Sequence, residues 1–289
     1  GPWLEETADL LRRHERHLEI GLHGVGHEYW VLRRLQRSEF HDAAGIMRPP
    51  GVIRRHLEAF GQLLEQNGLG PFPQSFVPPA LHHSFGNGEA SMQAILSEFG
   101  IRYLCTIFSR ARQYAPPLQE GLTWESGVLL IERNEAVVPW DHIGATLPLS
   151  INGPVLSLHW ANLLHQDSER NGEVIAAWGD YLVARARGFD VFLAPDTAAC
   201  WTQYCYYRLA ALRTQGPGVE IDCRRLPALA ALSGPVYLKV RERKNRRWQA
   251  QGGQLVSSRE LGEGVTLHAI LPLPGEKRLS LHPCTARIS

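Results

Sequence analysis

Two histidines four positions apart, His23 and His27, are the residues whose type and spacing point most directly to metal chemistry. They lie at the end of an apolar segment, 17–24, that we predict to be a short buried strand. If the chain turns helically there, both imidazoles lie on one face and can converge on one ion at about 2.0–2.1 Å. Gly24 and Gly26 leave that face uncrowded. The segment therefore predicts a divalent metal site, with zinc as the expected ion; two polar loop histidines without a ligand role are the alternative.

Two imidazoles do not complete a catalytic site, because zinc in enzymes usually takes three protein ligands and keeps one position for water. Further groups must come from other strand ends. His159 ends the apolar segment 155–159, and an imidazole titrates near neutral pH, which suits a general acid. Asp141 and Asp196 also follow apolar segments and are candidates for a base or a ligand, although aspartates there are more often helix caps or turn formers.

Aromatic residues fall near the same predicted strand ends, namely Trp140, Trp160 and Trp201. Sugar-binding clefts stack such rings on pyranose faces, so Trp140 and Trp160 are candidate substrate-binding residues, while core packing is the alternative for each. His82 and His83 follow a proline pair, and one of them could face the same cleft.

The elements that must position these residues alternate between helix and strand. Predicted helices cover 3–16, 52–67, 89–99, 173–187 and 200–213. Predicted strands cover 75–77, 101–106, 128–132, 136–140, 155–159 and 191–194. Alternation on this scale indicates a parallel sheet or barrel, in which the active site lies at the C-terminal ends of the strands.

A domain boundary is predicted at the breaker sequence 215–218, Gln-Gly-Pro-Gly. Residues 1–215 would form the α/β domain, and residues 219–289 a small antiparallel β domain, because helical periodicity fades beyond the breaker. Its predicted strands are 219–223, 236–241, 254–257, 265–271 and 278–282.

Composition narrows the classes of function. The 289 residues are 44% hydrophobic and 20% charged, which is typical of a soluble globular protein. A net charge of +1 argues against nucleic acid or an anionic membrane as a partner chosen by bulk charge, and no apolar run approaches the roughly 20 residues of a membrane span. Five cysteines without Cys-x-x-Cys spacing do not form a disulfide framework. No signal peptide is visible, so a cytoplasmic location is the default, with secretion or the periplasm expected if a leader precedes residue 1.

Three segments, in this order, resemble the polysaccharide deacetylase superfamily, the NodB-like carbohydrate esterases. Residues 19–27, Glu-Ile-Gly-Leu-His-Gly-Val-Gly-His, resemble its second motif, which supplies two metal-binding histidines. Residues 76–79, Phe-Val-Pro-Pro, resemble the motif after the next strand, and residues 156–159, Leu-Ser-Leu-His, resemble the last motif. The resemblance covers roughly residues 1–200.

This resemblance implies a distorted (β/α) barrel of the glycoside hydrolase and deacetylase type. It implies metal-assisted hydrolysis of an N-acetyl group on a carbohydrate or a related small molecule. In that reaction His23 and His27 would hold the divalent ion, Leu158 would border the acetyl pocket and His159 would protonate the departing amine.

Two features depart from the family pattern. The family's first motif, an aspartate pair that supplies the base and the third metal ligand, should end a strand before helix 3–16, and would therefore lie before Gly1. Either the chain begins inside the barrel or this member lacks the pair, and the base would then come from Asp141 or Asp196. The second departure is Val77, where many members carry an arginine that orients the base.

Two other functions stay open. A catalytically degenerate barrel would bind carbohydrate without turnover, with aromatic residues such as Trp140 and Trp160 carrying the affinity. A glycoside hydrolase would use paired carboxylates, for which Asp141 and Asp196 are the candidates.

Overall fold

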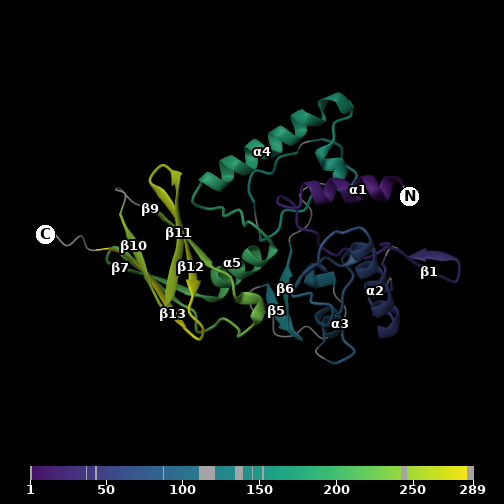
Figure 1. The fold of residues 1–289 in the computed structure, drawn as a ribbon, viewed down its shortest axis with the longest axis horizontal. Coiled ribbons are helices and arrows are strands. Elements are labelled where there is room, and N and C mark those ends of the chain that lie inside the picture. The colour runs from purple at the N-terminus through teal and green to yellow at the C-terminus, as the bar shows by residue number, and fades with distance from the viewer. Residues whose placement is uncertain are drawn as a thin grey trace. The chain divides into compact units, whose positions relative to one another are not determined.

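A computed structural model describes residues 2–36, 38–42, 44–86, 88–110, 121–133, 139–144, 146–151, 153–241 and 246–284 (Figure 1). The chain forms two compact units, Gly1–Arg133 and Asn134–Ser289. Each unit has its own sheets and its own apolar core.

The first unit holds three α-helices and six strands among its described residues. In chain order its elements are α1 (Pro2–Arg13), β1 (Tyr29–Val31), β2 (Arg34–Gln36), α2 (Pro50–Gln66), β3 (Ser75–Phe76), the 3₁₀ turn η1 (Pro79–Leu81), α3 (Met92–Glu98), β4 (Tyr103–Thr106), η2 (Phe108–Arg110), β5 (Leu122–Glu125) and β6 (Val128–Glu132). The helices predicted at 3–16, 52–67 and 89–99 are confirmed as α1, α2 and α3.

The main sheet of the first unit has the strand order β3-β4-β6-β5. β3 pairs with β4 and β4 with β6 in parallel, while β5 returns antiparallel to β6. All four residues of β4 are buried, as expected for a parallel strand that is covered on both faces.

Local sequence explains the two helices that pack near this sheet. α2 begins at Pro50, whose fixed φ suits the first helical position, and it buries Ile53, Leu57 and Leu64 on one face. α3 begins after Ser91, whose hydroxyl accepts a hydrogen bond from the Ala94 amide.

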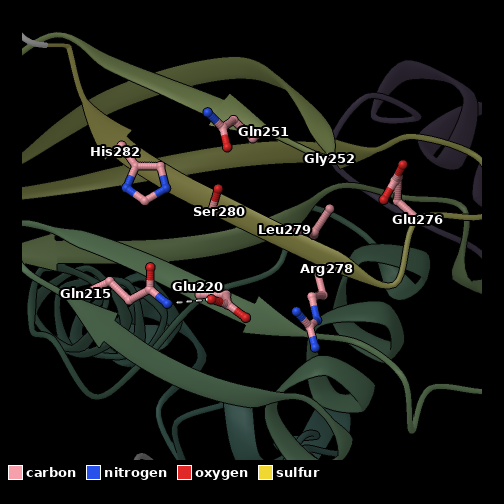
Figure 2. A pocket seen from close by; sticks show the side chains of 9 residues that line it. All are labelled: Gln215, Glu220, Gln251, Gly252, Glu276, Arg278, Leu279, Ser280 and His282. Carbon is pink, nitrogen blue, oxygen red and sulfur yellow. Dashed lines mark hydrogen bonds between the residues drawn. The ribbon is translucent and has the colours of Figure 1, made fainter.

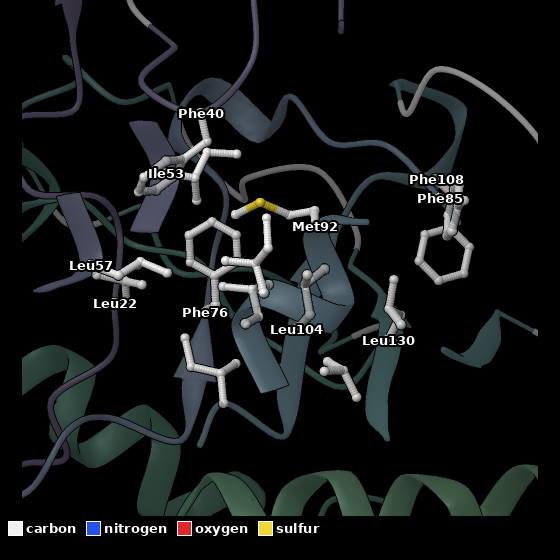
Figure 3. Close-up of a cluster of buried hydrophobic side chains, with 14 residues drawn as sticks. Leu22, Phe40, Ile53, Leu57, Phe76, Phe85, Met92, Leu104, Phe108 and Leu130 are labelled. Atoms are coloured by element: carbon white, nitrogen blue, oxygen red, sulfur yellow. The ribbon is translucent and has the colours of Figure 1, made fainter. Parts of the chain in front are cut away.

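The core of the first unit joins these faces to the sheet. Figure 3 shows Ile53 and Leu57 of α2 together with Phe76 of β3, and Leu104 of β4 beside Leu130 of β6. The fully buried cluster contains fourteen apolar residues: Leu22, Phe40, Ile53, Leu57, Phe76, Phe85, Met92, Ile95, Leu96, Ile101, Leu104, Phe108, Val128 and Leu130.

The second unit begins with 3₁₀ turns and helices and ends in antiparallel sheets. Its elements are η3 (Trp160–Leu163), η4 (Ser168–Arg170), α4 (Asn171–Arg187), α5 (Thr197–Leu209), β7 (Ala211–Gln215), β8 (Gly218–Asp222), η5 (Ala230–Leu232), β9 (Val236–Arg241), β10 (Trp248–Gln251), β11 (Gly253–Gly262), β12 (Val265–Pro272) and β13 (Arg278–Pro283). The predicted C-terminal strands are confirmed as β8, β9, β11, β12 and β13, whereas β10 was not predicted.

Two antiparallel sheets share the core of the second unit. Their strand orders are β10-β13-β8-β7 and β11-β12-β9. The core takes Ile221 and Leu281 from the first of these sheets, Val236 and Ile270 from the second, and Tyr206 from α5. The sheets therefore pack as a sandwich with α5 against it.

The predicted domain boundary at 215–218 lies inside this unit, in the turn of the β7–β8 hairpin. Gln215 pairs with Gly218 across that turn. Residues 211–213, predicted as the end of a helix, belong instead to strand β7, and α5 ends at Leu209.

The predicted (β/α) barrel is wrong, because none of the four sheets closes among the described residues. The parallel run of the first unit stops at β6, where β5 turns back antiparallel. Residues 155–159 and 191–194, predicted as barrel strands, pair with no strand in the part of the chain that the structure describes. Of segment 17–24 only Leu22 bridges to a strand, at Phe76. Residues 136–138 of the predicted strand 136–140 lie outside the described part of the chain.

Side chains occupy the place of backbone pairing in the second of these unpaired segments, 191–194. The ammonium of Lys239 on β9 donates to the carbonyls of Ala186, Gly188 and Val191, and the ring of Phe192 stacks on Tyr237 with centroids 4.6 Å apart. Segment 188–192 is thereby held against β9 by its carbonyls and one ring.

Two further findings bear on the sequence-based expectations. All five cysteines are free thiols. None of the helices in the described ranges has the length and apolar character needed to cross a bilayer.

Candidate functional site

The histidine pair follows directly on the sheet of the first unit. The Leu22 amide donates to the Ser75 carbonyl, and the Val77 amide donates to the Leu22 carbonyl, each at 2.9 Å. Leu22 therefore runs parallel to β3, and residues 23–28 leave the sheet at its C-terminal edge, where sites in α/β folds usually lie. The expected helical turn is wrong: residues 23–28 form a loop in which His27 has a φ of 58°.

The two imidazoles lie in edge-to-face contact with one another. Their centroids are 4.9 Å apart, with 70° between the ring planes. Two rings that bind one zinc ion at about 2.1 Å have centroids about 5 Å apart. The measured separation is therefore compatible with a shared ion.

A backbone carbonyl sets the tautomer of His23. Its Nδ1 lies 2.8 Å from the carbonyl oxygen of Val77. A carbonyl only accepts, so Nδ1 carries the proton, and in the neutral ring the lone pair is on Nε2. A second nitrogen anchored in this way is the usual arrangement of metal-binding histidines.

A buried glutamate, Glu39, binds the backbone of this loop through hydrogen bonds. One carboxylate oxygen, Oε2, accepts hydrogen bonds from three successive amides, those of Val25, Gly26 and His27, at 2.8, 3.1 and 3.1 Å. Successive amides turned toward one point form a concave anion site. The loop is thus wrapped around a carboxylate that belongs to the protein itself.

The other oxygen of Glu39 is also engaged. Oε1 lies 2.6 Å from Nδ1 of His56 on α2, and the glutamate side chain is only 1% exposed. A buried carboxylate requires several donors to offset its lost hydration. Here four donors, from the loop and from α2, meet that requirement.

Gly24 is needed for this arrangement. Its φ of +94° is one that other residues rarely adopt. A Cβ at this position would clash with Oε2 of Glu39 and lie 2.9 Å from Cγ of Pro79. We expected Gly24 to make room for an ion, and it makes room for the glutamate.

Histidines 82 and 83, which we considered as cleft residues, adjoin a buried polar cluster. His83 is fully buried, and Nε2 of Gln93 lies 2.8 Å from its Nε2. His41 is also buried and its Nε2 lies 3.1 Å from the Ser84 hydroxyl. Burial lowers the pKa of His41 to about 4, and burial followed by the neighbouring His41 lowers the pKa of His83 well below its usual value. The rings of His41 and His83 are therefore neutral at pH 7 and lie in the interior.

The histidine pair does not recruit a third ligand of its own. Among the described residues, no three His, Cys, Asp or Glu side chains are grouped so as to hold an ion. Glu39 accepts hydrogen bonds from the loop, but both of its oxygens are already engaged.

The other predicted site residues belong to the second unit, where one asparagine joins two of their loops. Asn162 is fully buried, and its Nδ2 donates to the carbonyls of Pro139 and His142 at 3.0 and 2.9 Å. Its Oδ1 accepts from the amide of His159 at 2.8 Å. The structure therefore ties the loop that carries Trp140 and Asp141 to the loop that carries His159 and Trp160.

Most of these side chains are exposed. Trp140 and Trp160 are 62% and 82% exposed, His159 and Asp141 are also exposed, and Leu158 is half-buried. Asp196 lies elsewhere in the unit, as the N-cap of α5, where its Oδ1 accepts from the Ala199 amide at 2.7 Å.

A shallow polar hollow of ≈ 350 Å³ lies on the outer face of the sheet β10-β13-β8-β7 in the second unit. Figure 2 shows its side chains on β7, β8 and β13, with the amide of Gln215 bonded to the carboxylate of Glu220 at 2.7 Å. The lining residues are Gln215, Glu220, Gln251, Gly252, Glu276, Arg278, Leu279, Ser280 and His282. None of them was selected from the sequence.

Comparisons with known proteins give no family for this chain. No protein-family model, no curated protein and no solved structure matches it. Function must therefore be argued from the site itself.

We expect Glu39→Gln to lower the free energy of unfolding by about 2–3 kcal/mol, because an amide nitrogen would face donors in a buried place. Urea denaturation followed by circular dichroism measures the change. The matched control is Glu98→Gln, since that carboxylate is exposed and pairs with Arg54 at the surface; its effect should be much smaller. Equal effects of the two substitutions would contradict the role given to Glu39.

Stability should fall in acid as the buried histidines take up protons. The unfolded chain binds a proton at His41 near pH 6.5, whereas the folded chain does so only near pH 4. The stabilisation is therefore complete above pH 6.5 and is lost progressively below it, by about 3 kcal/mol for this residue as the pH approaches 4. Urea denaturation across this range should show the decline, and His41→Gln should make the curve shallower; an unchanged slope would refute the assignment.

Proposed function

We propose that the first unit binds a divalent metal ion, with zinc as the expected ion, through His23 and His27. We propose further that this ion takes part in a hydrolysis reaction in which the protein removes N-acetyl groups from a carbohydrate or a related amide. The observation that carries the proposal is the pair of adjacent imidazoles, whose centroids are 4.9 Å apart, on a loop whose amides are held by a buried carboxylate.

The residues present fit such an ion. The Val77 carbonyl assigns the Nδ1 proton of His23, so that Nε2 is the nitrogen that would bind the ion. His27 is placed by its own amide, which donates to Glu39. A ligand loop fixed before the ion arrives loses less conformational entropy on binding.

A bound ion of this kind polarises an amide carbonyl and lowers the pKa of a coordinated water. The chain's own contribution, on this proposal, is to hold two ligands at a solvent-accessible edge and to leave further positions for water and substrate. The role of His159 as general acid stays a prediction, and so does that of Asp141 as base, which replaces the aspartate pair of the family pattern. Asp196 is less suited to be the base because its Oδ1 already caps α5.

Zinc binding tests the proposal directly. Calorimetric titration of the dialysed protein should show one site, and His23→Ala and His27→Ala should each weaken it at least about a hundredfold, since a lost ligand costs more than a lost second-shell contact. Release of acetate from an N-acetylated oligosaccharide should require the ion and both histidines. His159→Ala belongs in the same assay.

The matched control is His14→Ala, because His14 is an exposed histidine of the same unit. It should leave zinc binding unchanged. A protein that retains no zinc in elemental analysis, or whose zinc survives both substitutions, would refute the metal site; zinc binding without acetate release would refute only the reaction.

A second candidate function, carbohydrate binding without turnover, is favoured by one observation. Trp140 and Trp160 are exposed on two loops that Asn162 holds together. Exposed indoles on a fixed loop pair suit stacking on sugar rings. The glycoside hydrolase alternative has no comparable support, because Asp196 is occupied as a helix cap.

If this second function holds, an oligosaccharide should shift the tryptophan fluorescence of the protein, and the shift should not need zinc. Trp140→Ala and Trp160→Ala should each weaken binding about tenfold or more, as loss of a stacking ring typically does. Trp3→Ala is the control, because Trp3 is 84% exposed on α1. Binding that survives both substitutions, or no binding, would contradict this function.

A further inference from the structure

We propose that the β1–β2 ribbon, residues 29–36, docks the first unit on an anionic lipid surface. The ribbon is a two-stranded hairpin that follows the histidine loop, and Figure 1 shows it extending away from α2. The inference does not depend on the metal site.

One face of the ribbon is anchored to the unit by Arg48. The guanidinium of Arg48 lies 3.9 Å from the ring centroid of Tyr29, and its Nη2 donates to Oε1 of Gln36 at 2.7 Å. Its Nε donates to the carbonyl of Glu39 at 3.0 Å. Tyr29 and Gln36 are paired across the two strands, so Arg48 fixes both strands from the same side.

The other face is apolar and open. Trp30 and Leu35 are directly opposite one another in the strand register, and side chains alternate between the faces of a strand. Both therefore project opposite to Tyr29 and Gln36, with 67% and 43% of their surface exposed. Leu32 at the apex is 93% exposed. Apolar side chains grouped on a protruding element are typical of an interaction site.

The apex keeps its leucine at a conformational cost. Leu32 and Arg33 have φ of 48° and 65°, the left-handed values of a two-residue hairpin turn for which Asn-Gly is the preferred sequence. A leucine is strained there, and strain of this kind accumulates at functional places. A leucine at the apex is therefore better explained by binding to a partner than by a preference for the turn.

Charge selects the occupant. Arg33 and Arg34 adjoin Leu32 and are exposed, and within the described ranges neither is paired with a carboxylate. Lipid phosphates would pair with these two guanidinium groups, and the membrane–water interface accommodates tryptophan and leucine side chains. The chain's net charge of +1 gives no general attraction to such a surface, so the attraction must be local.

The size and shape of the ribbon also favour a lipid surface over a second copy. Three exposed apolar side chains are far fewer than the roughly 20–30 residues per side of a stable interface. A convex hairpin enters a lipid interface without needing a complementary groove.

The test uses co-sedimentation of the full chain with vesicles of phosphatidylcholine alone and of phosphatidylcholine with an equal amount of phosphatidylglycerol. Binding is expected to the mixed vesicles, and it should weaken as salt is added. Leu32→Asn should weaken it about tenfold by removing the aliphatic apex. The same change should leave the fold intact or more stable, because asparagine tolerates the left-handed conformation. Arg33→Gln combined with Arg34→Gln should weaken it about tenfold or more.

Matched controls separate the ribbon from the rest of the surface. Leu149→Asn removes another fully exposed leucine, and Arg213→Gln combined with Arg259→Gln makes the same change in net charge at exposed positions on β7 and β11. Both should bind as the unaltered chain does. Failure to sediment with the mixed vesicles, or equal losses in the controls, would overturn the proposal. So would a dimer in analytical ultracentrifugation that Leu32→Asn dissociates, because the occupant would then be a second copy.

Discussion

The carboxylate of Glu39 is the constraint on which the candidate site depends. A charge with 1% of its side chain exposed is tolerated only where donors surround it, and its donors are three loop amides and the imidazole of His56. If the loop changed conformation, the carboxylate would lose its hydrogen bonds. Conversely, water could reach the carboxylate only if the loop opened. Positive φ at Gly24 and His27 is the conformation that turns the amides inward.

The buried polar groups near this edge of the sheet differ in charge because they differ in partners. Glu39 meets four donors, whereas His83 meets one amide side chain and an apolar surround. Burial lowers the pKa of His41, where it outweighs the opposing effect of Asp42, and the pKa of His83, and it keeps both rings neutral. Glu39 is thus a buried carboxylate with both oxygens bonded, whereas the imidazoles of His41 and His83 are uncharged at neutral pH.

The sequence predicted what is encoded locally and failed where distant groups decide. Strand β9 is predicted at the residues it occupies, Val236–Arg241, because alternation and flanking breakers are local signals. The barrel was wrong because closure depends on pairing between distant segments, and the apolar run 191–194 is held by the Lys239 side chain rather than by a neighbouring strand. The histidine pair was found from spacing and glycines. Glu39 was missed, since a glutamate twelve residues beyond His27 carries no signal until the loop folds over it.

If His23 and His27 bind an ion as proposed, the occupied state of Glu39 decides what kind of site the loop would offer. Oε2 already accepts three hydrogen bonds and Oε1 one, so this carboxylate is not available as a direct ligand. Its part would instead be indirect: it accepts a hydrogen bond from the His27 amide and so fixes where that residue lies. Such support orients imidazoles and favours a cation without lowering the number of open coordination positions. On the proposal that the two imidazoles bind zinc, the loop would supply two of the three protein ligands that a catalytic site usually has, and two of the four that a structural site takes. The proposed ion would therefore be closer to the catalytic arrangement, with the third ligand still to come from outside the loop.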